Sequence, residues 1–230
     1  MDDRLPDVTA LDLEFAENPD PRCACVLVLD VSGSMAGAPI EALSRGLTDL
    51  RADLLEDPVA RNRVELSLVT FGTHARIAHD WATVDNFTPP ALAAGGATYL
   101  GEATQTALRL LEERKNTYRA AGASYYRPWM VLMTDGLPAG EGEDIVNSAS
   151  QALRTVVSER KALVFPVAVG EHGNVDFLEA YSGTKAKKLT GLRFGALFQW
   201  LSASLAQVSQ SQPGDRVPLP VADSWSEVVG

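Results

Sequence analysis

The stretch that decides the fold is residues 23–34, CACVLVLDVSGS. Cys23–Leu29 is a continuous apolar run, β-branched in part, and Asp30 ends it abruptly. Such a run, without polar alternation, is typical of a strand whose two faces are both buried, as in parallel sheets. Trp129–Thr134 and Leu163–Val169 are runs of the same kind. The sequence therefore predicts that these segments are buried strands of one sheet.

Helical patterns lie between the strands. Residues 39–54 begin with a proline and carry apolar residues at helical spacing, and Pro58 is expected to mark the end of this helix. Thr98 stands at the N-cap position of a second helix, and Asp144 can cap a third. A basic, aromatic segment, residues 112–127, is expected between the second helix and the next strand.

Two more runs, Val64–Phe71 and Ala75–Trp81, are separated by a Gly-Thr-His turn and predict an antiparallel hairpin. Pro166 indicates that the strand containing it lies near an edge or is bulged. Strands that alternate with helices predict an α/β domain. We expect a Rossmann-like, doubly wound and mostly parallel central sheet with one antiparallel edge strand and with helices on both faces.

The pattern also suggests boundaries. Residues 1–22 are polar, acidic and proline-containing, and we expect an N-terminal arm that packs on the domain. Residues 23–209 hold the periodic signal and form the domain. Residues 210–230 have little periodicity and are expected to be a C-terminal tail.

The amino-acid composition argues against some classes of function. The chain has 230 residues, 46% of them hydrophobic, and a formal net charge of −10. An acidic surface repels phosphate groups, so we expect neither nucleic acid nor membrane as a partner. The first residues, MDDRLP, lack the apolar core of a signal peptide, and a cytoplasmic location is expected. Cys23 and Cys25 have no second Cys or His pair nearby, which favours two small buried residues over a redox or metal pair.

Oxygen-bearing side chains follow the predicted strands. Asp30, Ser32 and Ser34 end the first strand, Thr98 opens a helix, and Asp135 follows Trp129–Thr134. In an open α/β sheet the carboxyl ends of the strands form the ligand crevice. These ligands suit Mg²⁺, which takes oxygens at about 2.0–2.1 Å, with Mn²⁺ or Ca²⁺ as alternatives. Neutral hydroxyls leave the ion with charge to attract a carboxylate of a protein partner.

These residues resemble the von Willebrand factor type A domain family. Its metal-ion-dependent adhesion site reads Asp-x-Ser-x-Ser with a distant Thr and a distant Asp, and this chain matches it throughout. The resemblance covers roughly residues 23–208 and implies direct coordination by Ser32 and Ser34. It implies direct or water-mediated roles for Asp30, Thr98 and Asp135. It also implies a metal-dependent binding module that is not an enzyme.

A narrower resemblance is to the bacterial TerY-like, stand-alone members of this family. It is carried by residues 17–23 (ENPDPRC), 124–129 (SYYRPW) and 217–220 (VPLP). This resemblance implies a stress or tellurite-resistance system with a companion Ser/Thr kinase and a PP2C-type phosphatase.

Other function classes stay open at this point. A metal-assisted phosphatase or hydrolase would use the same ion, but no His or Glu is placed by motif beside Asp30 or Asp135. The chain could also be a substrate of a companion kinase, with acceptors such as Thr117, Tyr118 and Ser124. The aromatic segment, residues 125–129, is interpreted as packing at the start of a strand in preference to a partner surface.

Overall fold

A computed structural model describes residues 18–222 and 224–227. Seven strands form one sheet in the order β3-β2-β1-β4-β5-β6-β7. The strands are β1 (Cys23–Asp30), β2 (Val64–Phe71), β3 (Ala75–Thr83), β4 (Trp129–Thr134), β5 (Leu163–Ala168), β6 (Lys187–Leu189) and β7 (Ser226–Glu227). The helices are η1 (Gly33–Met35), α2 (Ala38–Glu56), α3 (Pro58–Arg63), α4 (Leu100–Ala120), α5 (Glu143–Ser158), α6 (Val175–Ser182) and α7 (Phe194–Ser209).

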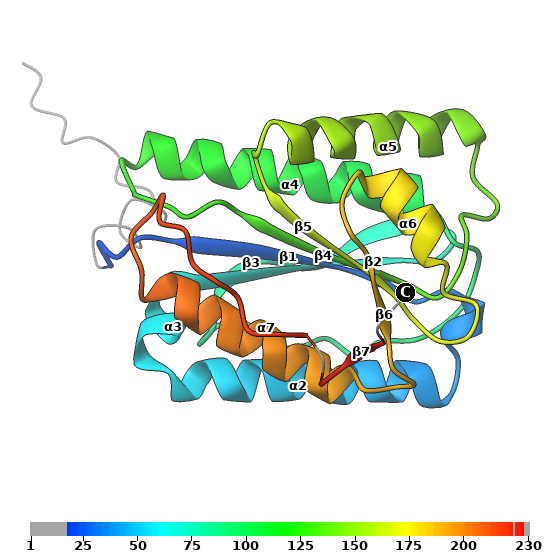
Figure 1. The fold of residues 1–230 in the computed structure, drawn as a ribbon, viewed down its shortest axis with the longest axis horizontal. Helices are drawn as coiled ribbons and strands as arrows, with labels where there is room; N and C mark the ends of the chain where they lie inside the picture. The colour runs from blue at the N-terminus through cyan, green and yellow to red at the C-terminus, as the bar shows by residue number, and fades with distance from the viewer. Residues whose placement is uncertain (1–17, 223, 228–230) are drawn as a thin grey trace, which may run out of the picture.

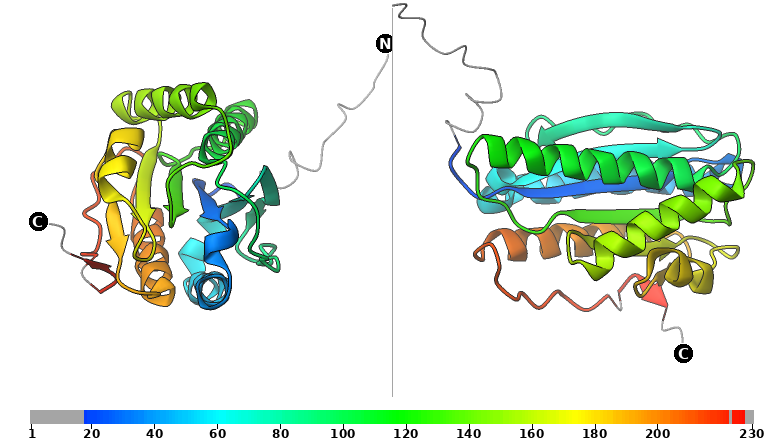
Figure 2. Two further views of the ribbon diagram at one scale, coloured as in Figure 1. Left: turned by 90° about the vertical axis from the view of Figure 1, so that its right-hand side faces the viewer. Right: turned by 90° about the horizontal axis from the view of Figure 1, so that it is seen from above.

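Helices cover both faces of the sheet. In Figure 1, α4 and α5 lie on one face, whereas α2, α3 and α7 lie on the other. Figure 2 shows α2 and α7 side by side against the sheet. Alternate residues of β1 enter the two cores: Leu27 and Leu29 pack on the α2–α7 side, and Val26 and Val28 on the α4–α5 side. This two-sided burial explains the continuous apolar run, and the predicted fold class is confirmed.

The edges of the sheet differ from the prediction in one respect. β3 is antiparallel to β2, as expected, but β7 adds a second antiparallel strand beside β6. β7 lies in the predicted C-terminal tail and has two residues, which is too short to leave a periodic signal. It is held by tertiary contacts: Trp225 is buried, and its ring centroid lies 5.4 Å from that of Trp200.

One helix boundary was predicted correctly and another was not. α2 ends at Glu56, just before Pro58 as expected, and Pro58 then begins the short helix α3, because a proline in the first turn needs no amide partner. Asp57 caps this short helix, with its Oδ1 2.9 Å from the amides of Val59 and Ala60. The segment from residue 112 onward continues α4 as far as Ala120, because its apolar and long polar side chains have a sheet face to cover.

The remaining sequence predictions concern the termini and the cysteines. Of the predicted N-terminal arm, residues 1–17 lie outside the described residues. Residues 18–22 contact the domain, and the amide of Arg22 donates to the carbonyl of Ser124 at 2.8 Å. Cys23 and Cys25 are free thiols buried in β1, as the pattern indicated. Within the described ranges, no helix is both long and apolar enough to cross a bilayer.

Candidate metal centre

The candidate site lies where the order of the strands reverses. β1 pairs in parallel with β2 on one side and with β4 on the other, so the chain builds the sheet outward from β1 in one direction through β2 and β3 and in the opposite direction through β4 and β5. A reversal of this kind opens a crevice beyond the carboxyl ends of the strands. Asp30 is the last residue of β1, and Asp135 directly follows β4.

Asp30 lies buried at the bottom of the site. Its side chain accepts two hydrogen bonds: the Ser32 amide lies 2.8 Å from Oδ1, and the Thr134 hydroxyl lies 2.6 Å from Oδ2. Burial raises the pKa of Asp30, hydrogen bonds from Ser32 and Thr134 oppose that rise, and the charge of Asp135 adds to it. The carboxylate is therefore fixed in direction and lies in an environment that disfavours its negative charge.

The two serines join Asp30 to the second carboxylate. The hydroxyl oxygens of Ser32 and Ser34 are 3.0 Å apart, and Ser34 Oγ donates to Asp135 Oδ1 at 2.9 Å. Ser34 is exposed, whereas Asp135 is only 9% exposed. The turn at Gly33 thus brings the hydroxyls and carboxylates of four predicted ligands into one connected group.

The loop before Thr98 packs against the serine turn through its backbone. The amide of Gly33 donates to the carbonyl of Gly96 at 3.1 Å, and the amide of Gly95 donates to the carbonyl of Val31 at 2.7 Å. Gly96 has a φ of +83°, and a Cβ there would lie 2.3 Å from Thr73 Oγ1. Glycine is required because both its dihedral angle and its surroundings exclude a side chain.

Thr98 reaches the same edge, but the predicted capping role is wrong. Thr98 is joined to Ala139, in the loop after Asp135, by two backbone hydrogen bonds of 3.0 and 3.1 Å. The N-cap of α4 is Tyr99, which provides no side-chain cap. The backbone of Thr98 is held by the neighbouring loop, and its side chain is buried and does not cap α4.

Two further residues support the site. One is Thr134, which sequence reasoning missed; it donates to Asp30, and its place at a strand end was the available signal. The other is Glu141, which caps α4: its carboxylate oxygens lie 2.6 and 3.1 Å from the amides of Gly101 and Glu102. A carboxylate at a helix N-terminus is favourable. The predicted cap of α5 was also wrong, because Gly142 is the N-cap and Asp144 lies in the first turn.

The donor set fits a hard divalent cation. No Lys or Arg within the described parts of the chain forms an ion pair with Asp30 or Asp135, so these carboxylates lack a side chain that balances their charge. The same residues contain no group of three or more His, Cys, Asp or Glu arranged for a metal. A cation here would depend on hydroxyl oxygens, as Mg²⁺ sites with few carboxylates do.

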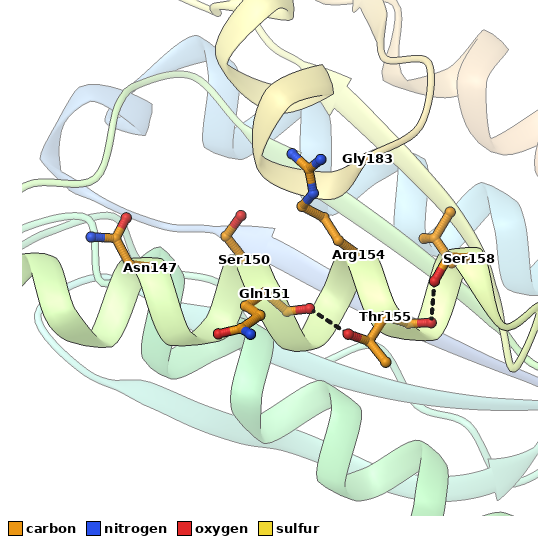
Figure 3. Close-up of a pocket in the computed structure, with 8 residues that line it drawn as sticks. Asn147, Ser150, Gln151, Arg154, Thr155, Ser158 and Gly183 are labelled. Carbon is orange, nitrogen blue, oxygen red and sulfur yellow. Dashed lines mark hydrogen bonds between the residues drawn. The ribbon is translucent and has the colours of Figure 1, made fainter.

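One hollow adjoins the site, lined by Val31, Gly95 and Gly96, and another lies away from these carboxylates. Figure 3 shows the second hollow, of about 510 Å³, along the outer face of α5, where Ser150, Gln151 and Arg154 line the wall beside Gly183. Its hydroxyl groups are already bonded to backbone carbonyls, for example Thr155 Oγ1 to Gln151 O at 2.9 Å. His74, in the turn between β2 and β3, lies with its Nδ1 3.5 Å from Glu102 Oε2 on the exposed surface.

Fold and site together define an α/β domain with an oxygen-rich cluster at the switch point of its sheet. Residues 25–191 match the von Willebrand factor type A domain, and the chain belongs to that family. The uncharacterized protein sll0103 of Synechocystis sp. is 30% identical over 189 residues, which are 76% of this chain and 41% of that protein. The chain therefore spans less than half the length of this relative.

Solved structures show the same fold at low sequence identity. A von Willebrand factor type A protein from Catenulispora acidiphila has a TM-score of 0.62 at 18% identity, covering 81% of this chain and 43% of that one. The pilus adhesin SpaC from Lactobacillus rhamnosus GG has a TM-score of 0.63 at 12% identity, covering 82% and 30%. Proximal thread matrix protein 1 from the mussel byssus, with a zinc-occupied MIDAS motif, has a TM-score of 0.53 at 18% identity, covering 81% and 48%.

Proposed function

We propose that this protein is a metal-dependent protein-binding module and not an enzyme. A divalent cation, Mg²⁺ in the first place, would be held by the side chains of Asp30, Ser32, Ser34, Thr98 and Asp135. The partner would contribute an Asp or Glu carboxylate. Membership of the von Willebrand factor type A family supports this proposal, since domains of this family generally mediate binding to other proteins.

One observation carries the proposal. Ser34 is exposed and bonded to both Ser32 and Asp135, so the serine hydroxyls and a carboxylate oxygen lie together at the surface end of a buried cluster. Asp30 is held beneath them by the Ser32 amide and the Thr134 hydroxyl. This chain therefore pre-arranges its oxygen atoms before any partner arrives, which lowers the entropy cost of binding.

The chemistry of the donors favours binding over hydrolysis. When bound, a divalent cation would supply a Lewis-acidic position for an outside carboxylate. Ser32, Ser34 and Thr98 would orient that position without neutralising it, because hydroxyls are uncharged donors. A hydrolase also needs a base near the reacting atoms. Asp30 accepts two hydrogen bonds and Asp135 accepts one. Both carboxylates are therefore held in place, which suits them to positioning a cation more than to acting as a base.

The narrower part of the proposal concerns context. We assign the protein to a bacterial TerY-like stress or tellurite-resistance system in the cytoplasm, with a Ser/Thr kinase and a PP2C-type phosphatase as companions. This part rests on the sequence resemblance of residues 17–23, 124–129 and 217–220. An acidic surface, with a net charge of −10, supports protein partners over nucleic acid or anionic membrane.

The test is a calorimetric titration of metal-stripped protein with Mg²⁺, repeated with Mn²⁺, Ca²⁺ and Zn²⁺. Asp135→Asn keeps the size of the side chain and removes its charge, and should weaken Mg²⁺ binding by about 100-fold. Asp144→Asn is the matched control, because Asp144 is an exposed acid on α5. Equal binding by wild type and Asp135→Asn would refute the site.

The binding function needs its own measurement. A peptide library displaying Asp and Glu should be retained by the protein with Mg²⁺ and released by EDTA. Retention that survives EDTA and Asp135→Asn would show that binding does not use this centre. Turnover of a phosphoester panel that is lost in Asp135→Asn would instead establish an enzyme.

A further inference from the structure

One edge of β5 is unpaired over its first residues. β6 pairs with β5 only at Val167 and Ala168. The preceding residues, Leu163–Phe165, have β4 on one side and no strand among the described residues on the other. This open part is the amino-terminal end of β5, so it lies at the opposite end of the sheet from Asp30.

Within the described residues, part of this edge has backbone hydrogen-bonding groups that no neighbouring strand uses. The amides of Leu163 and Val169 donate to carbonyls on the β4 side, to Pro128 and Thr134 at 2.8 Å each. Because residues of a strand face its two neighbours alternately, Val164 and Pro166 face away from β4. Val164 presents an N–H and a C=O on the open side, whereas the C=O of Pro166 faces the start of the pairing with β6. A proline at such a position, with no N–H to donate, is typical of an edge strand.

A groove of about 530 Å³ runs along this edge. Its walls come from β5, α7 and the C-terminal segment, and are mostly apolar. The aromatic part includes Phe165 and Trp200, whose ring centroids are 5.6 Å apart, and Trp225. The indole N–H of Trp225 is buried without a hydrogen-bond partner among the described residues. Val221, which also lines the groove, is 78% exposed.

The rim of the groove is basic in an otherwise acidic protein. Arg127, Lys185 and Lys187 are exposed and line it, and none of its described lining residues is acidic. Lys185 Nζ lies 3.0 Å from Glu179 Oε2, whereas Arg127 and Lys187 form no ion pair with the described residues. The chain as a whole carries a net charge of −10, so this cluster is a local exception that favours an anionic occupant.

We propose that this groove binds an extended, acidic segment of a partner protein as an added strand on β5. Backbone groups of the segment would pair with the N–H and C=O of Val164, and such backbone pairing is the usual source of affinity in strand addition. Alternate apolar side chains would enter the groove, and the intervening acidic side chains would meet Arg127 and Lys187. The groove needs no metal, so this second docking surface is independent of the candidate metal centre.

The experiment uses the full chain in EDTA, which removes any contribution of the metal centre. The probe is a short, fluorescently labelled peptide of alternating valine and glutamate, measured by fluorescence anisotropy. Arg127→Glu/Lys187→Glu should weaken its binding by about tenfold, because two rim contacts change from attractive to repulsive. Arg45→Glu/Arg109→Glu, which changes two exposed arginines on α2 and α4, should bind like wild type.

Two more measurements distinguish strand addition from nonspecific electrostatic attraction. The peptide should slow hydrogen exchange at the Val164 amide, and a peptide of alternating valine and lysine should not bind. Equal binding by both peptides, normal binding by Arg127→Glu/Lys187→Glu, or unchanged exchange at Val164 would overturn the proposal. A dimer in sedimentation experiments that dissociates in this variant would assign the groove to a second copy and overturn it as well.

Discussion

The two ends of the sheet differ in the groups that surround a buried carboxylate. At the amino end of β2, Glu65 is fully buried between Arg114 and Arg22: Arg114 Nε lies 2.7 Å and Arg22 Nε 3.7 Å from its carboxylate oxygens. The Tyr118 hydroxyl also donates to Glu65. At the carboxyl end of β1, Asp30 shares its surroundings with a second carboxylate, Asp135, and with neutral hydroxyls.

This difference separates a structural cluster from a binding cluster. Burying a charge is costly unless an opposite charge or hydrogen bonds compensate it. In the Glu65 cluster, arginine side chains of the same chain compensate the buried carboxylate. The cluster therefore stabilises one arrangement of β2 and α4. The Asp30 cluster has hydrogen bonds but no cationic side chain among its described neighbours, and the proposed function assigns the missing positive charge to a bound cation.

Removing the charge of Glu65 should have the largest effect on stability. Glu65→Gln leaves buried guanidinium groups without their carboxylate, so the free energy of unfolding should fall by about 3–5 kcal/mol. Urea denaturation measures this. Glu113→Gln, which breaks an exposed pair with Arg109, should change it by less than about 0.5 kcal/mol. Similar losses in the two variants would contradict the distinction between the ends of the sheet.

Adding Mg²⁺ should have the next largest effect, and only through the Asp30 end. At 100 times its dissociation constant, a ligand of the native state stabilises it by about 2.7 kcal/mol. Wild type and Glu65→Gln should both gain this amount in denaturation with Mg²⁺, whereas Asp135→Asn should gain nothing. A gain that disappears in Glu65→Gln but persists in Asp135→Asn would reverse the roles of the two clusters.

Thr134 should affect metal affinity without being a ligand. Thr134→Val removes the hydrogen bond to Asp30 Oδ2, so the carboxylate loses its fixed direction and Mg²⁺ binding should weaken about tenfold. Thr104→Val is the control, because this buried hydroxyl accepts a bond from Tyr181 away from the candidate ligands. Calorimetry should show an unchanged dissociation constant for the control. If both variants bind alike, Thr134 does not position Asp30.

The smallest expected effect is on the pH dependence of stability and comes from the thiol of Cys23, near Glu65. Burial raises the pKa of Cys23 from 9.0 to about 12, and the charge of Glu65 adds to the rise. The folded state therefore keeps the thiol neutral while the unfolded chain ionises above pH 9, so stability is lost as pH rises. Between pH 8 and 9.5 this loss should be about 0.8 kcal/mol.

Cys23→Ala isolates the contribution of this thiol to the pH dependence. The variant should be less stable throughout because of the lost packing, but its stability should fall less steeply with pH than that of wild type. Urea denaturation at several pH values measures both slopes. Parallel slopes would mean that Cys23 titrates alike in the folded and unfolded chains.

The site could be predicted because its residues lie close together in sequence or directly follow a recognisable strand. Asp30, Ser32 and Ser34 are close in sequence, and Asp135 directly follows a strand that was readable from its apolar run. Parallel strands place their carboxyl ends at one edge, so the convergence of these residues followed from the fold class. The N-cap at Thr98 was mispredicted because the N-cap is Tyr99 and the carboxylate that accepts from the first-turn amides, Glu141, comes from a distant loop.

The sequence by itself determined the buried strands, the two-sided burial of β1 and the residues at the carboxyl edge. These depend on local periodicity and on the residue types that end strands. Only the tertiary structure decided that Thr134 fixes Asp30, that β6 pairs only with the end of β5, and that Trp225 returns to flank the open part. Such features join segments far apart in the chain, and their energies come from burial and hydrogen bonding that no local pattern encodes.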